Sequence, residues 1–417
     1  MKKIYLFNTI FIWIFIINLY YFLYSNIIYS VSFNVNTSSD LHLMLDKVNN
    51  GDSIILKPGI YNGNFFITNS ISLIADGFVI LTSSGSSNIL NIKSSNVVVK
   101  GIIFYNSGKD TLLKDSCIFI EGNDVYILNN FFSECGFGIW NNGSFYNYLL
   151  NNVFIGTSDI ILSDRGNTIQ LYKNNNTIIS NNFIINGRDG IYISNSKEVS
   201  IDNNIFINVR FGIHYMFSNK CNVISNMVTD SLIGVAVMYS KYVDLINNFV
   251  YLNINHGLFF RDVLYSRILR NKSLYNIDGV LLGNSYFNDI INNDIMKNNI
   301  GVKVYSGSDE NLIYDNNFIS NKLHVQFLDN KKLVWSSKKI GNFWSHYIGW
   351  DLNMDNIGDK KFYVTTICDW LIYSYPVLRI IFDSPALILL KKIENQFPAF
   401  RKYSIIDIYP LMRPIIW

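Results

Sequence analysis

The chain has 417 residues, of which 49% are hydrophobic and 15% aromatic, so it can bury a large core and intrinsic disorder is excluded as its general state. Lys and Arg number 34 against 31 Asp and Glu, which gives a formal net charge of +3. This balance leaves no strong positive field and argues against nucleic acid as a partner.

Residues 1–30 have the layout of an export signal. Lys2 and Lys3 precede an almost uninterrupted apolar run from Ile4 to Leu23, as in a signal peptide. The run is also long enough to span a bilayer, and a good small-x-small cleavage site is missing. We therefore predict export from the cytoplasm, with an uncleaved membrane anchor as the alternative to a cleaved signal.

Residues 31–53 are predicted to form a capping segment. Ser39 and Asp40 can cap a short amphipathic helix whose apolar positions are Leu41, Leu45 and Val48. Such a helix would cover the open end of the repeats that follow, because an uncapped first coil exposes strand edges and core.

Residues 54–341 contain a repeat of about 22 residues, too short for paired helices and without a leucine-rich signature. The last Asn of each Asn-rich turn falls at Asn130, Asn152, Asn182, Asn204, Asn226, Asn248, Asn271, Asn293 and Asn317. Eight or nine residues after most of these stands a Gly, at Gly138, Gly190, Gly212, Gly234, Gly257, Gly279 and Gly301.

Short stretches between these markers, such as "IYIS" and "VDLI", alternate as half-buried strands do. The repeat therefore predicts an all-β protein, a right-handed parallel β-helix of roughly twelve coils. Asn tolerates the left-handed conformation and can stack into a ladder from coil to coil, and we expect Gly to supply the next corner. The longer step from Asn152 to Asn182 adds about eight residues, which should form a loop on one face.

The four cysteines, Cys117, Cys135, Cys221 and Cys368, show no C-x-x-C spacing, so a zinc or redox motif is not indicated. One disulfide between coils could form in an oxidising compartment, and the sequence leaves its pairing open.

The segment "GIHYMFS" carries a candidate metal site. Residues two apart in a strand share a face. We therefore expect His214 and Met216 to point outward, whereas Ile213 and Tyr215 point into the core.

Met238 in the next coil occupies the same repeat position as Met216 and should lie ~4.8 Å from it, with His214 adjacent. One imidazole and two thioethers suit Cu(I). These three residues therefore predict a copper site, to which His256 or Met227 could add a ligand. The alternative is that they only fill the surface or a groove.

An enzyme of this fold would need an acidic cluster along one groove. The positions two past the repeat Gly are Trp140, Tyr192, His214, Ala236, Phe259, Leu281 and Lys303; those four past it are Asn142, Ser194, Met216, Met238, Arg261, Gly283 and Tyr305. Neither row has an acid, and Asp189 and Asp278 lie four coils apart. We predict that the chain is not an enzyme. A carbohydrate-binding or polysaccharide-processing protein remains the alternative, because Tyr192 and Phe259 could stack on sugars.

Residues 342–417 form a separate C-terminal module, rich in Trp and Tyr. Within "WDLNMDNIGD" the oxygen spacing of a calcium loop is met by Asp351, Asn353, Asp355, Ile357 (through its carbonyl) and Asp359. Asn356 stands where Gly is usual, and a Glu at the twelfth position is missing. We predict a compact calcium loop, with an ordinary Asp/Asn-rich turn as the alternative.

The segment "SPALILLKKIENQF" predicts an amphipathic helix that begins at Ser384 and Pro385. Its apolar face carries Leu387, Leu390 and Ile393. That face could cover the last coil, and neighbouring residues between Trp370 and Trp417 could contact a membrane permease.

The coils, the segments "HYMFS" and "VMYS" and the tail "GNFWSHYIGWDLNMDNIGD" together resemble the NosD family, the accessory proteins of nitrous oxide reductase maturation. The resemblance spans nearly the whole chain, and its most specific parts are Gly341 to Asp359, "FDSPALILLKKIENQFP" and "IDIYPLMRP". His346 departs from the acidic residue expected in relatives.

This resemblance implies a periplasmic copper-binding protein that works with an ABC transporter, made of a permease and a cytoplasmic ATPase, and with a copper chaperone. It would help to deliver copper or sulfur for the copper-sulfide centre of nitrous oxide reductase. The resemblance also strengthens the assignment of copper to His214, Met216 and Met238.

Overall fold

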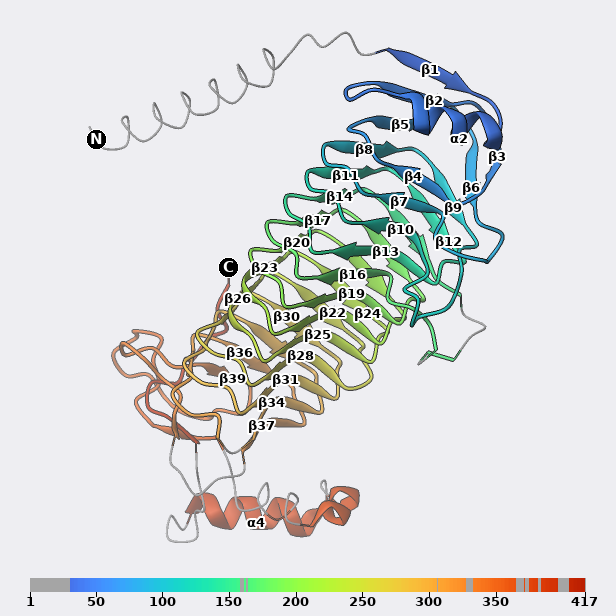
Figure 1. Cartoon of the computed structure of the whole chain (residues 1–417). Helices are drawn as coiled ribbons and strands as arrows, with labels where there is room; N and C mark the ends of the chain where they lie inside the picture. Colours follow the sequence, from blue (N-terminus) through green and yellow to red (C-terminus); the bar gives the residue numbers. More distant parts are fainter. Residues whose placement is uncertain are drawn as a thin grey trace, which may run out of the picture.

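The computed structural model describes residues 31–416 except 158–160, 163, 306, 328–332, 365–370, 372–374, 382–383 and 397–404. The predicted export segment, 1–30, lies outside the described residues. The described chain forms a long rod of stacked coils with a smaller C-terminal module at one end (Figure 1). Each coil contributes one strand to each of three parallel sheets, A, B and C, in that order.

Sheet A has 13 strands: β1 (Ser32–Val35), β2 (Ser53–Leu56), β5 (Ser72–Ala75), β8 (Val97–Lys100), β11 (Val125–Leu128), β14 (Tyr148–Leu150), β17 (Ile178–Ser180), β20 (Ser200–Asp202), β23 (Asn219–Ile224), β26 (Lys241–Ile246), β29 (Arg267–Leu269), β32 (Asp289–Ile291) and β35 (Leu312–Tyr314).

Sheet B has 13 strands: β3 (Gly59–Asn62), β6 (Val79–Thr82), β9 (Ile103–Tyr105), β12 (Phe131–Ser133), β15 (Val153–Ile155), β18 (Phe183–Ile185), β21 (Ile205–Ile207), β24 (Met227–Thr229), β27 (Phe249–Tyr251), β30 (Lys272–Leu274), β33 (Asp294–Met296), β36 (Asn317–Ile319) and β39 (Phe343–Trp344).

Sheet C has 12 strands: β4 (Phe65–Ile67), β7 (Leu90–Ile92), β10 (Ser116–Ile120), β13 (Phe137–Asn142), β16 (Ile169–Tyr172), β19 (Asp189–Ser194), β22 (Phe211–Met216), β25 (Ile233–Met238), β28 (His256–Arg261), β31 (Asp278–Gly283), β34 (Ile300–Val304) and β37 (Leu323–Phe327). The predicted parallel β-helix is confirmed, because side chains one repeat apart pair in register, as Met216 and Met238 do.

Asparagines line the corner between sheets A and B, where the sequence predicted a ladder. From Asn130 onward each side-chain Nδ2 donates to the Oδ1 of the next coil's Asn over 2.9 to 3.2 Å. The predicted ladder position Asn317 is wrong: the ladder passes through Asn316 and ends at Asn342. The preceding residue takes the left-handed conformation in most coils, as Asn203 does with φ 56°.

The repeat glycines do not form a corner, contrary to the sequence prediction. They lie inside the strands of sheet C, where a side chain would meet the next coil. A Cβ on Gly212 would stand 2.7 Å from the carbonyl oxygen of Gly234 and 2.6 Å from Val228 Cγ1. Close approach of neighbouring coils, and not a left-handed turn, therefore requires Gly in this row.

The extra residues between Asn152 and Asn182 lie between β15 and β16, at the corner of sheets B and C, as an added loop. At the same corner Cys117 forms a disulfide with Cys135 of the next coil, the pairing that the sequence left open, and Cys221 is a buried free thiol. A covalent bond thus joins two coils of the rod.

The N-terminal cap contains helix α2 (Ser38–Lys47), which buries Leu41 and Leu45. The predicted capping residues Ser39 and Asp40 are not the N-cap. That position belongs to Thr37, whose side chain accepts a hydrogen bond from the Asp40 backbone N–H over 3.1 Å. Strand β1 precedes the helix and pairs with β2, so the first coil begins within the predicted capping segment.

The last coil is covered by aromatic side chains from beyond residue 332. Trp344 stacks on Phe318 with ring centroids 4.2 Å apart, and Trp335 packs beside it. A small sheet of β38 (Leu333–Val334), β41 (Ile405–Asp407) and β40 (Phe362–Tyr363) completes this C-terminal cap. Because β39 also joins sheet B, the coils extend past Gly341.

The predicted amphipathic helix forms as α4 (Pro385–Gln396) and follows the short 3-10 helix η1 (Pro376–Ile381). Leu387 is buried, but the core of the rod reaches Trp335, Trp344, Val364 and Ile405 without including it. Figure 1 shows α4 beyond the end of the rod. The described cover over the last coil comes from the aromatic cap, and an additional cover by the apolar face of α4 stays a prediction.

Candidate functional site

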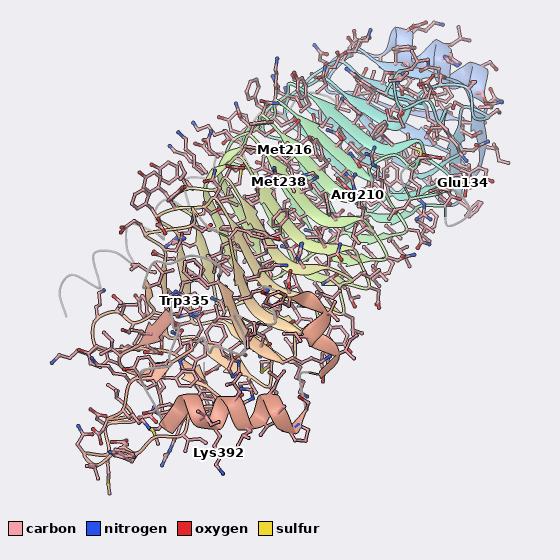
Figure 2. All side chains as sticks on the ribbon, turned by 90° about the horizontal axis from the view of Figure 1, so that it is seen from below. Glu134, Arg210, Met216, Met238, Trp335 and Lys392 are labelled. Atoms are coloured by element: carbon pink, nitrogen blue, oxygen red, sulfur yellow. A yellow bond between two sulfur atoms is a disulfide. The ribbon has the colours of Figure 1, made fainter. Side chains whose placement is uncertain are left out.

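The predicted copper ligands lie on strands β22 and β25 of sheet C. His214 pairs in register with Ala236, and Met216 pairs with Met238. Ile213 and Tyr215, the intervening residues of β22, are fully buried in the core. The predicted alternation of faces therefore holds, and Figure 2 shows Met216 and Met238 near one another on the outside of the coils.

His214 differs from the expectation of an exposed ligand, because its side chain is only 7% exposed. The ring packs edge-on against Tyr192 and Phe211, with centroids 4.8 and 4.7 Å away. These two neighbours exclude water from the imidazole while leaving it on the outer side of sheet C.

A buried carboxylate orients this imidazole. Asp189, which is fully buried, lies one coil earlier and accepts a contact from His214 Nδ1 at 3.1 Å. Arg210 binds the same carboxylate through Nε and one terminal nitrogen, each at 2.7 Å. Burial alone would raise the pKa of Asp189, but the hydrogen bonds and charges of His214 and Arg210 outweigh it and lower the pKa below its usual value.

Asp189 contacts Nδ1 of His214, so Nε2 is the ring nitrogen that could bind a ligand. Nε2 is buried and has no hydrogen-bond partner. A histidine that donates Nδ1–H to a carboxylate and keeps Nε2 open is the arrangement that metal-binding histidines use. With Nδ1 held by the carboxylate and Nε2 open, this geometry suits a ligand.

Met216 and Met238 are half-buried, and the sulfur atom of Met216 has a hydrogen-bond donor nearby. The Tyr192 hydroxyl donates to Met216 Sδ at 3.4 Å. Neighbouring strands lie ~4.8 Å apart and residues two apart on one strand ~6.6 Å apart, so His214, Met216 and Met238 occupy one small area. This area could hold a soft cation such as Cu(I).

The pairing of Asp189 with His214 and Arg210 was not predicted from the sequence, where Asp189 was considered only as an acid too far from Asp278 and Arg210 was not considered. The available signal was positional: Asp189 stands directly before a repeat Gly, so its side chain lies beside the row of His214 in the next coil. A row-by-row reading of charges would have found this pairing.

A second buried carboxylate, Asp278, lies four coils from Asp189 on the same sheet. His256 Nδ1 stands 2.9 Å from its Oδ2, and Lys303 Nζ stands 3.6 Å away. His256 thus belongs to another cluster, and Met227 lies in sheet B on β24, so neither is a neighbour of Met216.

The predicted calcium loop is a tight turn in which carboxylates accept backbone N–H groups. Asp351 accepts from Asp355 and Asn356 at 3.2 and 2.9 Å, and Asp359 accepts from Leu352 at 2.8 Å. Asn356 has φ 67°, the left-handed conformation for which it replaces Gly. This hydrogen-bond pattern fits the alternative of an Asp/Asn-rich turn, and calcium at Asp351, Asn353, Asp355, Ile357 and Asp359 stays a prediction.

Within the part of the chain that the structure describes, no three His, Cys, Asp or Glu side chains gather into a group that could hold a metal ion. Two of the three copper candidates are thioethers, so they fall outside such a group. The described residues also contain no helix of the length and hydropathy needed to cross a bilayer.

Comparison with known proteins gives a family. Residues 155–349 match the family model described as "Periplasmic copper-binding protein (NosD)". A "Probable ABC transporter binding protein NosD" from Stutzerimonas stutzeri is 34% identical over 375 residues, 86% of this chain and 86% of that protein. Its namesake from Pseudomonas aeruginosa is 35% identical over 378 residues, 86% of this chain and 87% of that protein.

Among solved structures, the A-module of the mannuronan C-5 epimerase AlgE4 from Azotobacter vinelandii superimposes with a TM-score of 0.60 at 13% identity and covers 75% of this chain and 100% of its own. A polygalacturonase from Erwinia carotovora reaches 0.50 at 14% identity, over 70% of this chain and 92% of its own. Likeness at this identity shows the shared β-helix fold alone.

Proposed function

This chain belongs to the NosD family, and on that premise we propose that it is a periplasmic accessory protein that binds an ABC transporter and helps to deliver copper or sulfur to the copper-sulfide centre of nitrous oxide reductase. The family model's description supports the periplasmic location and the copper binding. The names of the two relatives support the transporter as partner.

The observation that carries copper as the cargo is the environment of His214. Asp189 fixes Nδ1, and Nε2 is buried without a partner. Leaving a polar atom buried and unpaired costs about 1–3 kcal/mol of folding free energy. A ligand bound to Nε2 would remove this cost. Met216 and Met238 supply soft sulfur beside it, and His214 with these two would hold Cu(I).

Copper binding is tested by titrating Cu(I) into the whole chain against a chelator such as bicinchoninate. The wild-type protein should take up one Cu(I), and a variant with His214→Ala, Met216→Leu and Met238→Leu should lose at least 100-fold in affinity. Met227→Leu with Met296→Leu is the matched control, because these half-buried methionines lie on sheet B. Equal affinity in all three proteins would remove the proposed ligands.

The compartment is supported by the Cys117–Cys135 disulfide, since disulfides persist in oxidising compartments such as the periplasm. An export signal in residues 1–30, cleaved or kept as an anchor, completes this part of the proposal. Mass spectrometry of the protein from the periplasmic fraction tests both, because a cytoplasmic, reduced chain would contradict them.

Docking to the transporter permease is proposed for the C-terminal module. On α4 and η1 the apolar residues Ile380, Ile388 and Leu389 are more than half exposed, and Lys392 stands on the outer side of α4 in Figure 2. Exposed apolar residues gathered at one end of a rod indicate a contact surface.

Substitution of Ile388 and Leu389 by Ser should abolish co-purification with the permease. Phe78→Ser, at an exposed apolar residue near the other end of the rod, is the control. Deleting the whole segment from Trp370 would be less informative, because it removes β41 from the C-terminal cap. Unchanged co-purification of the Ile388 and Leu389 variant would reject this surface.

Calcium at the Asp351–Asp359 loop belongs to the same proposal, as a structural cation. Its support is the three carboxylates that this short loop brings together in sequence. Adding 1 mM calcium to chelator-treated protein should raise the melting temperature, and Asp355→Asn should cancel the rise. A melting temperature indifferent to calcium would leave the loop as a simple turn.

We also propose that the chain is not an enzyme. The two buried carboxylates of sheet C are each engaged by cations, Asp189 by Arg210 and Asp278 by Lys303. The alternative is a protein that binds or processes polysaccharide. If it processes polysaccharide, incubation with alginate or polygalacturonate should release shortened or unsaturated products. Appearance of such products would favour the alternative over copper delivery.

A further inference from the structure

Exposed aromatic side chains follow the corner between sheets C and A over consecutive coils. We name this set the aromatic ridge: Phe217, Tyr239, Tyr242, Tyr265 and Phe287. Their exposed fractions lie between 42% and 53%. The five rings form two adjacent rows, Phe217 with Tyr239 and Tyr242 with Tyr265 and Phe287. Aromatic rings dominate interface energetics when they become buried, so half-exposed rings stacked in this way offer a contact surface.

The backbone at these five positions is unfavourable for large side chains. All five have positive φ, from 49° at Tyr239 to 57° at Phe287, a conformation that favours Gly, Asn and Asp. Other coils do use Asn in the same rows, at Asn176 and Asn195. Neither burial nor backbone preference therefore accounts for the aromatic residues.

The ridge is held rigid by stacking between coils. Phe217 stacks on Tyr239 with centroids 5.1 Å apart, Tyr242 on Tyr265 at 5.5 Å, and Tyr265 on Phe287 at 5.3 Å. A partner would pay little to order these side chains. Because the rings cover one another's faces, their edges are what a partner meets, which suits an apolar protein patch better than a sugar ring.

The position of the ridge links it to the copper candidates. Phe217 and Tyr239 directly follow Met216 and Met238 in the chain. Two coils beyond Met238 in the same row, past Arg261, a hollow of about 420 Å³ opens at Gly283, which has no side chain to fill it. Such a hollow could take one anchoring side chain of a partner.

The end of the ridge beside the methionines carries excess positive charge. Lys220, Lys241 and Arg261 are exposed there. The acidic neighbours are Asp262, 3.7 Å from the Arg261 guanidinium, and Glu198, one coil before Lys220 and paired with Lys197 at 3.1 Å. Arg261 also lies over the Tyr239 ring at 6.0 Å. Charge complementarity therefore favours a partner with acidic residues around an apolar patch.

We propose that the aromatic ridge and the hollow at Gly283 form the docking surface of the folded protein that accepts Cu(I) from His214, Met216 and Met238. This inference rests on the proposed copper site. Transfer would be ligand exchange: a bond from a ligand of the partner to Cu(I) forms as a Cu(I)–thioether bond breaks, and the metal stays Cu(I) throughout. The partner must then bring its metal-entry site against the methionines, which an acidic-rimmed apolar patch on this surface would do.

The test compares two routes of copper exchange. A ridge variant with Tyr242→Asn, Tyr265→Asn and Phe287→Asn should fold, since Asn fits the left-handed backbone. Its uptake of Cu(I) from bicinchoninate should equal that of wild type, whereas transfer of Cu(I) to apo nitrous oxide reductase should slow at least 10-fold. Tyr146→Asn is the matched control, because Tyr146 lies in the same row with φ 56° and 49% exposure.

Two further variants sharpen the assignment. Gly283→Met fills the hollow, and its backbone tolerates the change because an added Cβ meets only ordinary contacts, the nearest being Tyr305 Cδ2 at 3.6 Å. Lys241→Glu reverses charge beside the ridge. Both should slow transfer to the reductase, and transfer by wild type should slow as salt is raised.

If the ridge variant transferred Cu(I) to the reductase at the wild-type rate, the proposed docking surface would be rejected. It would also be rejected if the variant were slower only in receiving Cu(I) from a copper chaperone. Binding of apo reductase without copper, measured by surface immobilisation, separates this inference from the copper site. Loss of this binding in the ridge variant supports the surface even if Cu(I) uptake by wild type fails, and unchanged binding rejects the surface even if uptake succeeds.

Discussion

The body of the rod contains the buried pair of Asp189 and His214, and the C-terminal cap, taken together with the last strand of sheet C that it covers, contains buried Asp407 and His324. The two regions handle the charge in opposite ways. In the body Asp189 is bonded by Arg210 and His214, and its pKa is lowered. In the cap Asp407 is bonded by neutral donors, the backbone N–H of Asn342 and Nε1 of Trp344, both at 2.7 Å.

The consequence in the cap is that both buried groups favour their neutral forms. Burial raises the pKa of Asp407 to about 6. Burial, together with the charge of nearby His346, lowers the pKa of His324 to about 3. His346, the departure noted in the sequence, thus lies beside a buried histidine, with ring centroids 4.4 Å apart.

The difference teaches what each buried pair contributes. In the cap, polar groups close the end of a hydrophobic core without ionic charge, which is a structural task. In the body, an ionised carboxylate orients an imidazole and leaves its second nitrogen open. Only the body pair has the electrostatic arrangement of a ligand site.

The largest expected effect comes from breaking the body pair. Asp189→Ala would leave Arg210 and His214 in a buried place without an anion, and removing one partner of a buried ion pair costs about 3–5 kcal/mol. Asp407→Ala removes an acceptor from neutral donors, at about 1–3 kcal/mol. Urea unfolding followed by circular dichroism measures both, and a smaller loss for Asp189→Ala than for Asp407→Ala would contradict the comparison.

The pH dependence of the cap is the next effect. Between about pH 4 and 6 folded Asp407 holds a proton that the unfolded chain, with its ordinary value of 3.8, has lost. The free energy of unfolding therefore falls as pH rises through this window, by about 3 kcal/mol in total. Asp407→Asn should remove that fall.

The difference between wild type and Asp407→Asn is the quantity to measure, by urea unfolding at pH 4, 5, 6 and 7. His324 acts in the opposite direction, because its low folded pKa makes stability rise with pH up to about 6.5. It is present in both proteins and cancels in the difference. Parallel pH profiles would show that Asp407 is not a neutral group in the folded cap.

The smallest expected effect concerns the tuning of the copper site. Asp189→Asn keeps an acceptor for His214 Nδ1 but removes the charge, and loss of such a supporting carboxylate weakens metal binding 10- to 100-fold, about 1.4–2.8 kcal/mol. His324→Ala in the cap should leave Cu(I) affinity unchanged. Chelator competition measures both, and an equal loss in the two variants would erase the distinction between body and cap.

Periodicity was the part of the fold that the sequence determined by itself. Strands, coil length, the corner ladder and the pairing of Met216 with Met238 follow from residues that recur at one spacing, because each coil must fit the coil before it. The longer step in the repeat predicted the extra loop, whereas capping residues and helical apolar spacing predicted the two terminal helices. Three sequence predictions were wrong: the ladder position Asn317, the N-cap of the first helix, which is Thr37, and the role of the repeat glycines.

The tertiary structure alone decided the burial of His214, its pairing with Asp189 and Arg210, and the composition of the C-terminal cap. His324 occupies the position of the repeat Gly in the last strand of sheet C, where no further sheet C strand follows to exclude a side chain. Asp407 reaches Trp344 from 63 residues further along the chain. Spacing along a sequence specifies contacts that repeat, whereas a single buried charge pair depends on side-chain directions and packing that only the assembled coils set.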